Sequence, residues 1–323
     1  MNTDSRPTAP CLLLALALLT LPVAGTAAPD RPVVPAPDLP ERTAVTLEAT
    51  GHFGPGAERE NSGIVKSRIW PDTFWVQNDS GDEPRVYPVT RTGEVIGAVR
   101  YDDEPGVRIG GAINVDWEDI AVDDSGQLIV ADVGNNRNDR RDLALYFLPE
   151  PSPRAGRTTW KRKVFFRYPD QHLFPAPSQD FNYDCEGVFF AHGKIYFVTK
   201  HRSDPHCRLY RLDSTAPHRT HTLTFVDAFA IGGKTTGADA TPDGRRLAIT
   251  TYDALWVFET GPGSEGWFRG KIYWMPFKAP QVEAVCFDGP DRLLLADEEA
   301  AALYTVDFAD LTRVDDLTFR PLD

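Results

Sequence analysis

Three segments of the sequence repeat one arrangement, an acidic residue followed by two apolar runs. In each segment a glutamate lies 14 residues before the polar residue that ends the second run, at positions 118 and 132, 186 and 200, and 283 and 297. Carboxylates can bind a hard cation, hold a backbone N–H group or move a proton. The repeat therefore predicts a group of carboxylates at equivalent places in separate structural units.

The elements around these acids predict the units. From about residue 43 onward, short β-prone runs alternate with Gly, Pro, Asp and Asn, and no convincing amphipathic helical pattern is present. Units of four strands recur 44 to 68 residues apart, which is typical of propeller blades. We predict an all-β fold, a β-propeller of four-stranded blades with five blades by count. The alternative is a sixth, degenerate blade, either within 134–183 or split across the termini.

The outer strands are predicted from apolar runs that follow each pair. Third strands are expected at 85–89, 144–148, 208–212, 254–258 and 302–306, and fourth strands at 95–101, 163–168, 222–229 and 271–275. The remaining run at 43–50 is too short for a blade. We expect it to close the ring by pairing with the C-terminal blade.

In a propeller the first strand of each blade lines a central channel, so acids at these strand starts should form a ring. The candidates are Glu60, Glu118, Glu186, Asp239 and Glu283. Asp116 and Asp184 lie two positions before two of them, on the same face of an extended chain. The ends of the second strands add Asn78, Asp79, Asp132, Lys200, Tyr252, Asp297 and Glu298.

Carboxylates that converge repel one another, and a bound cation relieves that repulsion. Oxygen ligands suit Ca²⁺ or Mg²⁺. The predicted metal ligands are Glu60, Asn78, Glu118, Glu186 and Glu283. The alternative is that these acids hold backbone N–H groups between blades.

Catalytic roles are assigned to residues beside this ring. They are Glu118, Glu186, Lys200 and His201, with His201 as a general base directly after Lys200. The predicted substrate-binding residues are Asn135, Asn136, Arg137, Arg140 and Tyr252, where arginines would receive an anionic group. A solvated loop without function is the alternative for 132–141. The sequence contains no GxSxG, P-loop or HExxH motif.

The composition limits the partners. The net charge of −13 disfavours nucleic acid and anionic membrane surfaces, so we expect a small-molecule substrate or a protein partner and a monomeric chain. The apolar run at 11–23 followed by small residues predicts a signal peptide over 1–28, with a retained anchor as the alternative. A proline-rich linker at 29–42 and one propeller domain at 43–323 follow. The expected location is secreted or periplasmic, with no membrane span after removal of the signal.

Three cysteines lie in the predicted mature chain. Because an oxidising compartment favours pairing, we expect a Cys185–Cys207 disulfide and a buried Cys286 thiol.

Several of these motifs resemble those of secreted propellers of the phytase-like esterase group and, more distantly, of the gluconolactonase and strictosidine synthase-like families. The resemblance rests on residues 60–64 with 78–79, on 117–120 with 132–136, and on 184–188. It implies a channel cation, usually calcium, and activity on lactones, phosphoesters or related small molecules. Carried over, Glu60 matches the first metal ligand, with Asn78, Glu118 and Glu186 as further ligands. The count of five blades departs from these relatives, which commonly have six.

Two function classes follow. One is a cation-dependent hydrolase of a small lactone or phosphoester. The other is a non-catalytic module that binds a protein or an envelope component. The module predicts an exposed aromatic patch, with Trp70, Trp75 and Trp267 as candidates.

Overall fold

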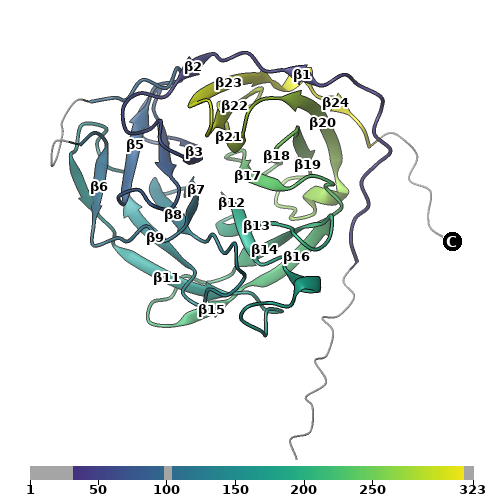
Figure 1. Cartoon of the computed structure of the whole chain (residues 1–323), viewed down its shortest axis with the longest axis horizontal. Coiled ribbons are helices and arrows are strands. Elements are labelled where there is room, and N and C mark those ends of the chain that lie inside the picture. The colour runs from purple at the N-terminus through teal and green to yellow at the C-terminus, as the bar shows by residue number, and fades with distance from the viewer. Residues whose placement is uncertain (1–31, 98–103, 316–323) are drawn as a thin grey trace, which may run out of the picture. The chain divides into compact units, whose positions relative to one another are not determined.

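The computed structural model describes residues 32–97 and 104–315, which belong to one compact unit. Five small sheets are arranged in a ring, the arrangement of a five-blade β-propeller (Figure 1). This confirms the predicted fold class and the count of five rather than six. The described residues contain no α-helix, only three single-turn 3-10 helices, and none of these is long and apolar enough to cross a bilayer.

Each blade has four strands in antiparallel order from the centre outward. The innermost strands are β3 (Asn61–Lys66), β7 (Trp117–Val122), β12 (Asp184–Ala191), β17 (Thr235–Ala240) and β21 (Val282–Phe287). The second strands are β4 (Phe74–Asn78), β8 (Gln127–Asp132), β13 (Lys194–Lys200), β18 (Arg246–Thr251) and β22 (Arg292–Asp297). The third strands are β5 (Arg85–Val89), β9 (Ala144–Pro149), β14 (Cys207–Leu212), β19 (Ala254–Glu259) and β23 (Ala302–Asp307), at the predicted places. The outer strands are β6 (Val107–Gly110), β11 (Arg162–Arg167), β16 (Thr224–Phe229), β20 (Lys271–Lys278) and β2 (Gly51–His52).

Long connections add further strands to neighbouring edges. β10 (Arg157–Thr159) leaves the second blade and pairs with β6 of the first, and β15 (Thr220–Thr222) leaves the third blade and pairs with β11 of the second. β24 (Thr312–Arg313) pairs with β20. These parallel or terminal additions extend three of the five sheets outward.

The N-terminal segment closes the ring, as predicted. β2 pairs antiparallel with β23 and supplies the outer strand of the last blade. The first part of the segment, β1 (Val45–Thr46), pairs instead with β20 of the fourth blade. The closing contact therefore lies at residues 50–52, at the C-terminal end of the predicted run and just beyond it.

The predicted fourth strand at 95–101 is wrong. β6 occupies that place, and residue Val95 makes only an isolated bridge with Val89. Gly97 has a φ of +79°, which interrupts an extended strand within the apolar run. Residues 98–101 of the predicted strand lie outside the described part of the chain.

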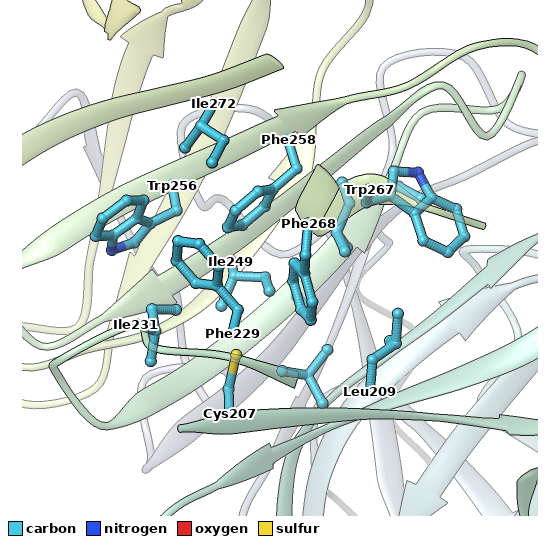
Figure 2. Packing of buried hydrophobic residues seen from close by; sticks show 14 of the residues in the cluster. Cys207, Leu209, Phe229, Ile231, Ile249, Trp256, Phe258, Trp267, Phe268 and Ile272 are labelled. Atoms are coloured by element: carbon cyan, nitrogen blue, oxygen red, sulfur yellow. The ribbon is translucent and has the colours of Figure 1, made fainter. Parts of the chain in front are cut away.

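The apolar core is divided into five clusters, each between two neighbouring blades. Figure 2 shows the cluster between the third and fourth blades, where Phe229 packs among aromatic rings of β19 and the following loop. Trp75 and Trp267 belong to such clusters and are fully buried. The predicted exposed patch of three tryptophans is therefore wrong, and only Trp70 reaches the surface.

The predicted Cys185–Cys207 disulfide is also wrong, because both thiols are free and buried. β13 lies between β12 and β14, so the two cysteines are two strands apart, about 10 Å. A disulfide needs Cα atoms within about 7 Å. The thiols also enter different clusters, Cys185 between blades two and three and Cys207 between blades three and four. Cys286 is buried as expected.

The described part of the proline-rich segment is buried against the propeller at one residue. Val34 is buried, and its backbone exchanges hydrogen bonds with Ala228 and Ala230 beside β16. The expectation of an unpacked linker therefore does not hold at this residue.

Candidate functional site

Each innermost strand carries a β-bulge at the same place. The extra, unpaired residues are Ser62, Glu118, Glu186, Thr236 and Glu283. Bulges re-aim a side chain out of the regular alternation. The equivalent positions in the first and fourth blades are therefore Ser62 and Thr236, and the predicted ring members Glu60 and Asp239 do not occupy them.

Small residues after the bulges let the innermost strands approach closely. A Cβ atom added to Gly187 would lie 2.6 Å from the Cβ atom of Ala238 in the next blade. A Cβ atom on Gly63 would lie 2.9 Å from the Cα atom of Asp119. This close approach explains why a small residue follows the bulge residue in four of the five blades; in the second blade Asp119 takes that place. It also brings bulge residues of neighbouring blades within reach of one another.

Five carboxylates from three blades form two overlapping groups. Oxygen atoms of Asp79, Asp116 and Glu118 all lie within 4.8 Å of one another, as do those of Glu118, Asp184 and Glu186. We call these five residues the carboxylate cluster. Glu118 belongs to both groups. The cluster confirms that Asp116 and Asp184 lie with the bulge glutamates, as their spacing indicated.

Burial dominates the electrostatics of the cluster. It raises the pKa of Glu118 well above the usual value, and the charge of Glu186 raises this pKa further. Burial likewise raises the pKa of Glu186 well above its usual value, although Lys200 opposes the shift. Burial and then the charge of Asp79 raise the pKa of Asp116 to about 6.

Direct ion pairs form on only one side of the cluster. The Arg202 guanidinium pairs with Asp184, and the Lys200 ammonium nitrogen lies 3.1 Å from Glu186 Oε1. Among the described residues, Asp79, Asp116 and Glu118 form no ion pair. Glu118 instead accepts a hydrogen bond of 3.2 Å from the Ser62 hydroxyl. These three carboxylates thus converge without a direct ion-pair partner, and the charges of Arg140 and Lys200 only oppose the rise in the pKa of Asp116 and of Asp79. The arrangement is costliest at Glu118, the buried member.

Gly134 forms a wall of this unneutralised side. A Cβ atom on Gly134 would lie 2.2 Å from Glu118 Oε1 and 2.5 Å from Asp116 Oδ2. On the first blade, Asn114 fixes the backbone at Asp79, because its side-chain amide donates hydrogen bonds to the carbonyl oxygens of Asn78 and Asp79. The carboxylate oxygens of Asp79, Asp116 and Glu118 suit a hard divalent cation, which would neutralise them.

The other predicted metal ligands belong to neither group, although the charge of Glu283 contributes to the raised pKa of Glu186. Glu60 is exposed and precedes β3 with a φ of +42°. The Asn78 amide nitrogen is bound to Gly56 O and Asp82, and its oxygen is buried without a partner. Glu283 accepts a hydrogen bond of 2.9 Å from Gln281. Only Glu118 and Glu186 of the predicted set are brought together with the cluster.

Lys200 lies between two bulge glutamates. The charges of Glu186 and then Glu283 raise its pKa against the opposing effect of burial. Its ammonium lies 5.3 Å from the ring centre of Tyr252, which is partly exposed beside it. Lys200 therefore acts as a fixed cation for Glu186 and Glu283.

His201 is buried, and burial lowers its pKa to about 4. The charges that act on it are those of Asp204, His206, Arg208 and Lys234, and none belongs to the carboxylate cluster. The alternation of β13 explains this, because Lys200 and His201 are consecutive and diverge. Its catalytic role stays a prediction.

The loop after β8 shapes the cluster through its backbone. Asn135 donates from its backbone N–H to Asp184 and from its amide to Tyr183 O, and its amide oxygen accepts two further N–H groups. Arg140 is bound to Asp132 and to Gly134 O.

Asn136 accepts a hydrogen bond from Arg202, and Arg137 is exposed. Of the predicted substrate residues in this loop, Asn136 and Arg137 are the exposed ones. Arg202 was missed, because nothing in the sequence marks it as the partner of Asp184.

Acids do bind backbone N–H groups between blades: Asp239 does so, as the alternative for the predicted ring acids expected, and Asp119, which was not among the candidates, does so too. Asp119 accepts from Val188 N at 2.7 Å, and Asp239 accepts from Phe287 N at 2.8 Å. Each spans from one innermost strand to the next. Asp239 is therefore structural and lies outside the carboxylate cluster.

The raised pKa values predict how stability depends on pH when cations are removed. Burial raises the pKa of Glu298 to about 7, and those of Glu118 and Glu186 are raised well above their usual values. Above pH 6.5 the folded state then binds more protons than the unfolded state, so stability falls as pH rises. His201 acts in the opposite direction only below its ordinary value of 6.5. We expect the thermal midpoint in EDTA to fall by several degrees between pH 6.5 and about 8.5. A flat or rising midpoint in this window would contradict the assignment.

Comparisons with known proteins give only distant similarity. No family profile matches the sequence, and no curated protein matches it. The chain is similar to a structure described as a candidate gluconolactonase, with 12% identity, a TM-score of 0.43, and coverage of 84% of this chain and 100% of that chain. It is similar to a PQQ-bound aldose sugar dehydrogenase from Streptomyces coelicolor, with 9% identity, a TM-score of 0.43, and coverage of 81% and 98%. A hydrazine synthase from Kuenenia stuttgartiensis has 10% identity, a TM-score of 0.44, and coverage of 79% and 84%. Similarity at this level says nothing about ligand or reaction.

Proposed function

We propose that the chain binds one divalent cation, Ca²⁺ before Mg²⁺, at the carboxylate cluster. One observation carries the proposal: Asp79, Asp116 and Glu118 converge within 4.8 Å without an ion pair, against a wall that only glycine permits at position 134. Asp184 and Glu186 are the other two members of the carboxylate cluster. Ca²⁺ takes six to eight oxygen ligands in flexible geometry, which suits carboxylates from three separate blades. The cation would sit beside three carboxylates with which no lysine or arginine of the described residues forms an ion pair.

We further propose that this site hydrolyses a small lactone or phosphoester. A bound cation polarises a carbonyl or phosphoryl oxygen. Asp116 is partly exposed, so a substrate oxygen could reach a cation held there. Lys200 pairs with Glu186 and Arg202 with Asp184, and these contacts hold the two carboxyl groups in place. The predicted export to the cell exterior or periplasm belongs to this proposal, since calcium is more available there.

The binding-module alternative predicted an exposed patch of three tryptophans, and two of the three are not exposed. Trp75 and Trp267 are buried in the clusters between blades. No other observation at the carboxylate cluster favours a protein partner over a cation, so we retain the enzyme reading.

Calorimetric titration of the EDTA-treated protein with Ca²⁺ tests the proposal. We expect one site in the wild type, and a Kd weakened at least about tenfold in Glu118→Gln, because ligand charge sets affinity. Glu94→Gln is the matched control, since Glu94 is an exposed glutamate of the first blade. Hydrolysis of lactone and phosphoester panels is then measured with and without Ca²⁺. Equal Ca²⁺ binding by wild type and Glu118→Gln would overturn the site, whereas binding without any turnover would overturn only the reaction.

A further inference from the structure

The outer edge of the second blade carries a concentration of cations that the carboxylate cluster does not use. Residues 151–169 contain six Lys or Arg residues and no Asp or Glu. Residues 214–223 add Arg219 and two histidines, again without an acid. The chain as a whole has a net charge of −13, so this edge is opposite in sign to the rest.

The fold brings these two segments together. β11 and β15 pair in parallel, with Phe165 opposite Thr220 and Arg167 opposite Thr222. A hollow of about 630 Å³ lies beside this pair of strands. We call it the basic groove, and its main lining residues are Trp160, Lys161, Arg162, Lys163, Phe165 and Arg219.

Five cations of this edge form no ion pair with any described residue. Lys163 donates to the Tyr146 hydroxyl at 2.7 Å, Arg167 to the Thr222 hydroxyl, and Arg219 to the Ser214 hydroxyl. In the described part of the chain, neither these three nor Lys161 and Arg162 form an ion pair. Arginines elsewhere, such as those at 211, 246 and 269, do pair with carboxylates. Unopposed like charges on one edge indicate an anionic partner from outside.

The alternation of β11 places two cations, Lys163 and Arg167, on one side of the strand with Phe165 between them. Val164 and Phe166 are buried, so Lys163, Phe165 and Arg167 lie along the other side of the strand. Phe165 is 38% exposed, which leaves an apolar ring face among the charges. Positive charges along a strand, with one exposed aromatic ring between them, suit a linear polymer whose ring-shaped units carry negative charges.

We propose that the basic groove binds an acidic polysaccharide, a sugar chain that carries carboxylate or sulfate groups. The charges of such a chain recur along its length, as the cations do along β11. An anionic bilayer is disfavoured because the cations line a hollow rather than a protruding apolar surface. Single-stranded nucleic acid is disfavoured because it stacks successive bases on several rings, and this edge exposes one. The proposal does not rest on the cation site.

Binding of heparin oligosaccharide to the whole chain, measured by calorimetry in buffer of low ionic strength, tests it. We expect binding that weakens as salt is added, and a Kd raised at least about tenfold in the triple variant Lys161→Gln, Lys163→Gln, Arg219→Gln. The control is Arg245→Gln, Lys271→Gln, Lys278→Gln, which changes the net charge equally on the fourth blade and should leave the Kd unchanged.

Three outcomes would overturn the proposal. The first is that the wild type fails to bind heparin. The second is that the control triple variant weakens binding as much as the groove triple variant does. The third is that phosphatidylserine vesicles, or a single-stranded oligonucleotide, bind more tightly than heparin through the same three cations. The far-UV circular dichroism of both variants checks that the fold is retained. Single substitutions at Lys161 or Arg219, both exposed, provide the same comparison if the triple variant unfolds.

Discussion

Gly134→Ala is expected to remove the stabilisation of the chain by Ca²⁺ while leaving the fold intact. The added methyl group would lie 2.2 Å from Glu118 Oε1 and 2.5 Å from Asp116 Oδ2. The ends of these side chains can turn away, so the fold tolerates the change, but the oxygens can no longer converge on one point. The backbone of Gly134 does not have a positive φ, so alanine adds no backbone strain there.

The effect should be large in a thermal unfolding experiment. A cation bound only by the folded state, at a hundred times its Kd, stabilises by about 2.7 kcal/mol. For a domain of this size that corresponds to a rise of about 5 °C in the thermal midpoint. We expect this rise in the wild type after EDTA treatment and addition of Ca²⁺, and none in Gly134→Ala.

Gly261→Ala is the matched control. A Cβ atom at this exposed glycine would meet nothing within 4 Å, and its φ is not positive. It should keep the full calcium-dependent rise. If Gly134→Ala kept the rise as well, the cation would bind elsewhere, and the assignment of the carboxylate cluster would fail.

The sequence predicts the blades well because each pair of inner strands has nearly constant length. The offset of 14 residues reports that length directly, and it places Glu118, Glu186 and Glu283 at equivalent bulges. In the first and fourth blades the bulge residue is Ser62 or Thr236. A search for acids therefore selects the neighbours Glu60 and Asp239 instead. Bulge position depends on strand register, which side-chain type alone does not specify.

Other features depend on contacts between distant segments. Arg202 pairs with Asp184 only because the loop after β13 passes beside the start of β12. The two cysteines share one blade but lie on opposite sides of its sheet, and this follows from pairing rather than from their separation in sequence. The basic groove likewise needs a connection of the third blade to lie on the second. Net charge averaged over the chain hides such a local reversal of sign.

Lys200→Met is expected to destabilise the chain strongly at alkaline pH and much less at acidic pH. The Lys200 ammonium is buried between Glu186 and Glu283, and removing it leaves two buried carboxylates without a cation. Breaking a buried ion pair by removing one partner costs about 3–5 kcal/mol. Methionine has a similar volume, so lost packing contributes little.

The pH dependence identifies the cause. Without Lys200, the pKa values of Glu186 and Glu283, already raised by burial, rise further, so the folded state binds more protons than the unfolded state. The stability of the variant must then fall as pH rises through these values, and it recovers as the carboxyl groups are protonated. Urea unfolding in EDTA at pH 6 and at pH 8.5 measures the free energy of unfolding at a pH where the carboxyl groups are more protonated and at one where they are less protonated. The loss relative to wild type should be clearly smaller at pH 6.

Two further variants separate charge from packing. Lys194→Met, at the other end of β13, removes a half-exposed lysine that pairs with Asp213 at 3.2 Å, and should cost less than about 1 kcal/mol at either pH. Adding Glu283→Gln to Lys200→Met should restore part of the stability at pH 8.5, because one unpaired buried charge is removed. An equal loss at both pH values, unchanged by Glu283→Gln, would mean that Lys200 contributes by packing alone, and that Glu186 and Glu283 do not depend on it for their charge.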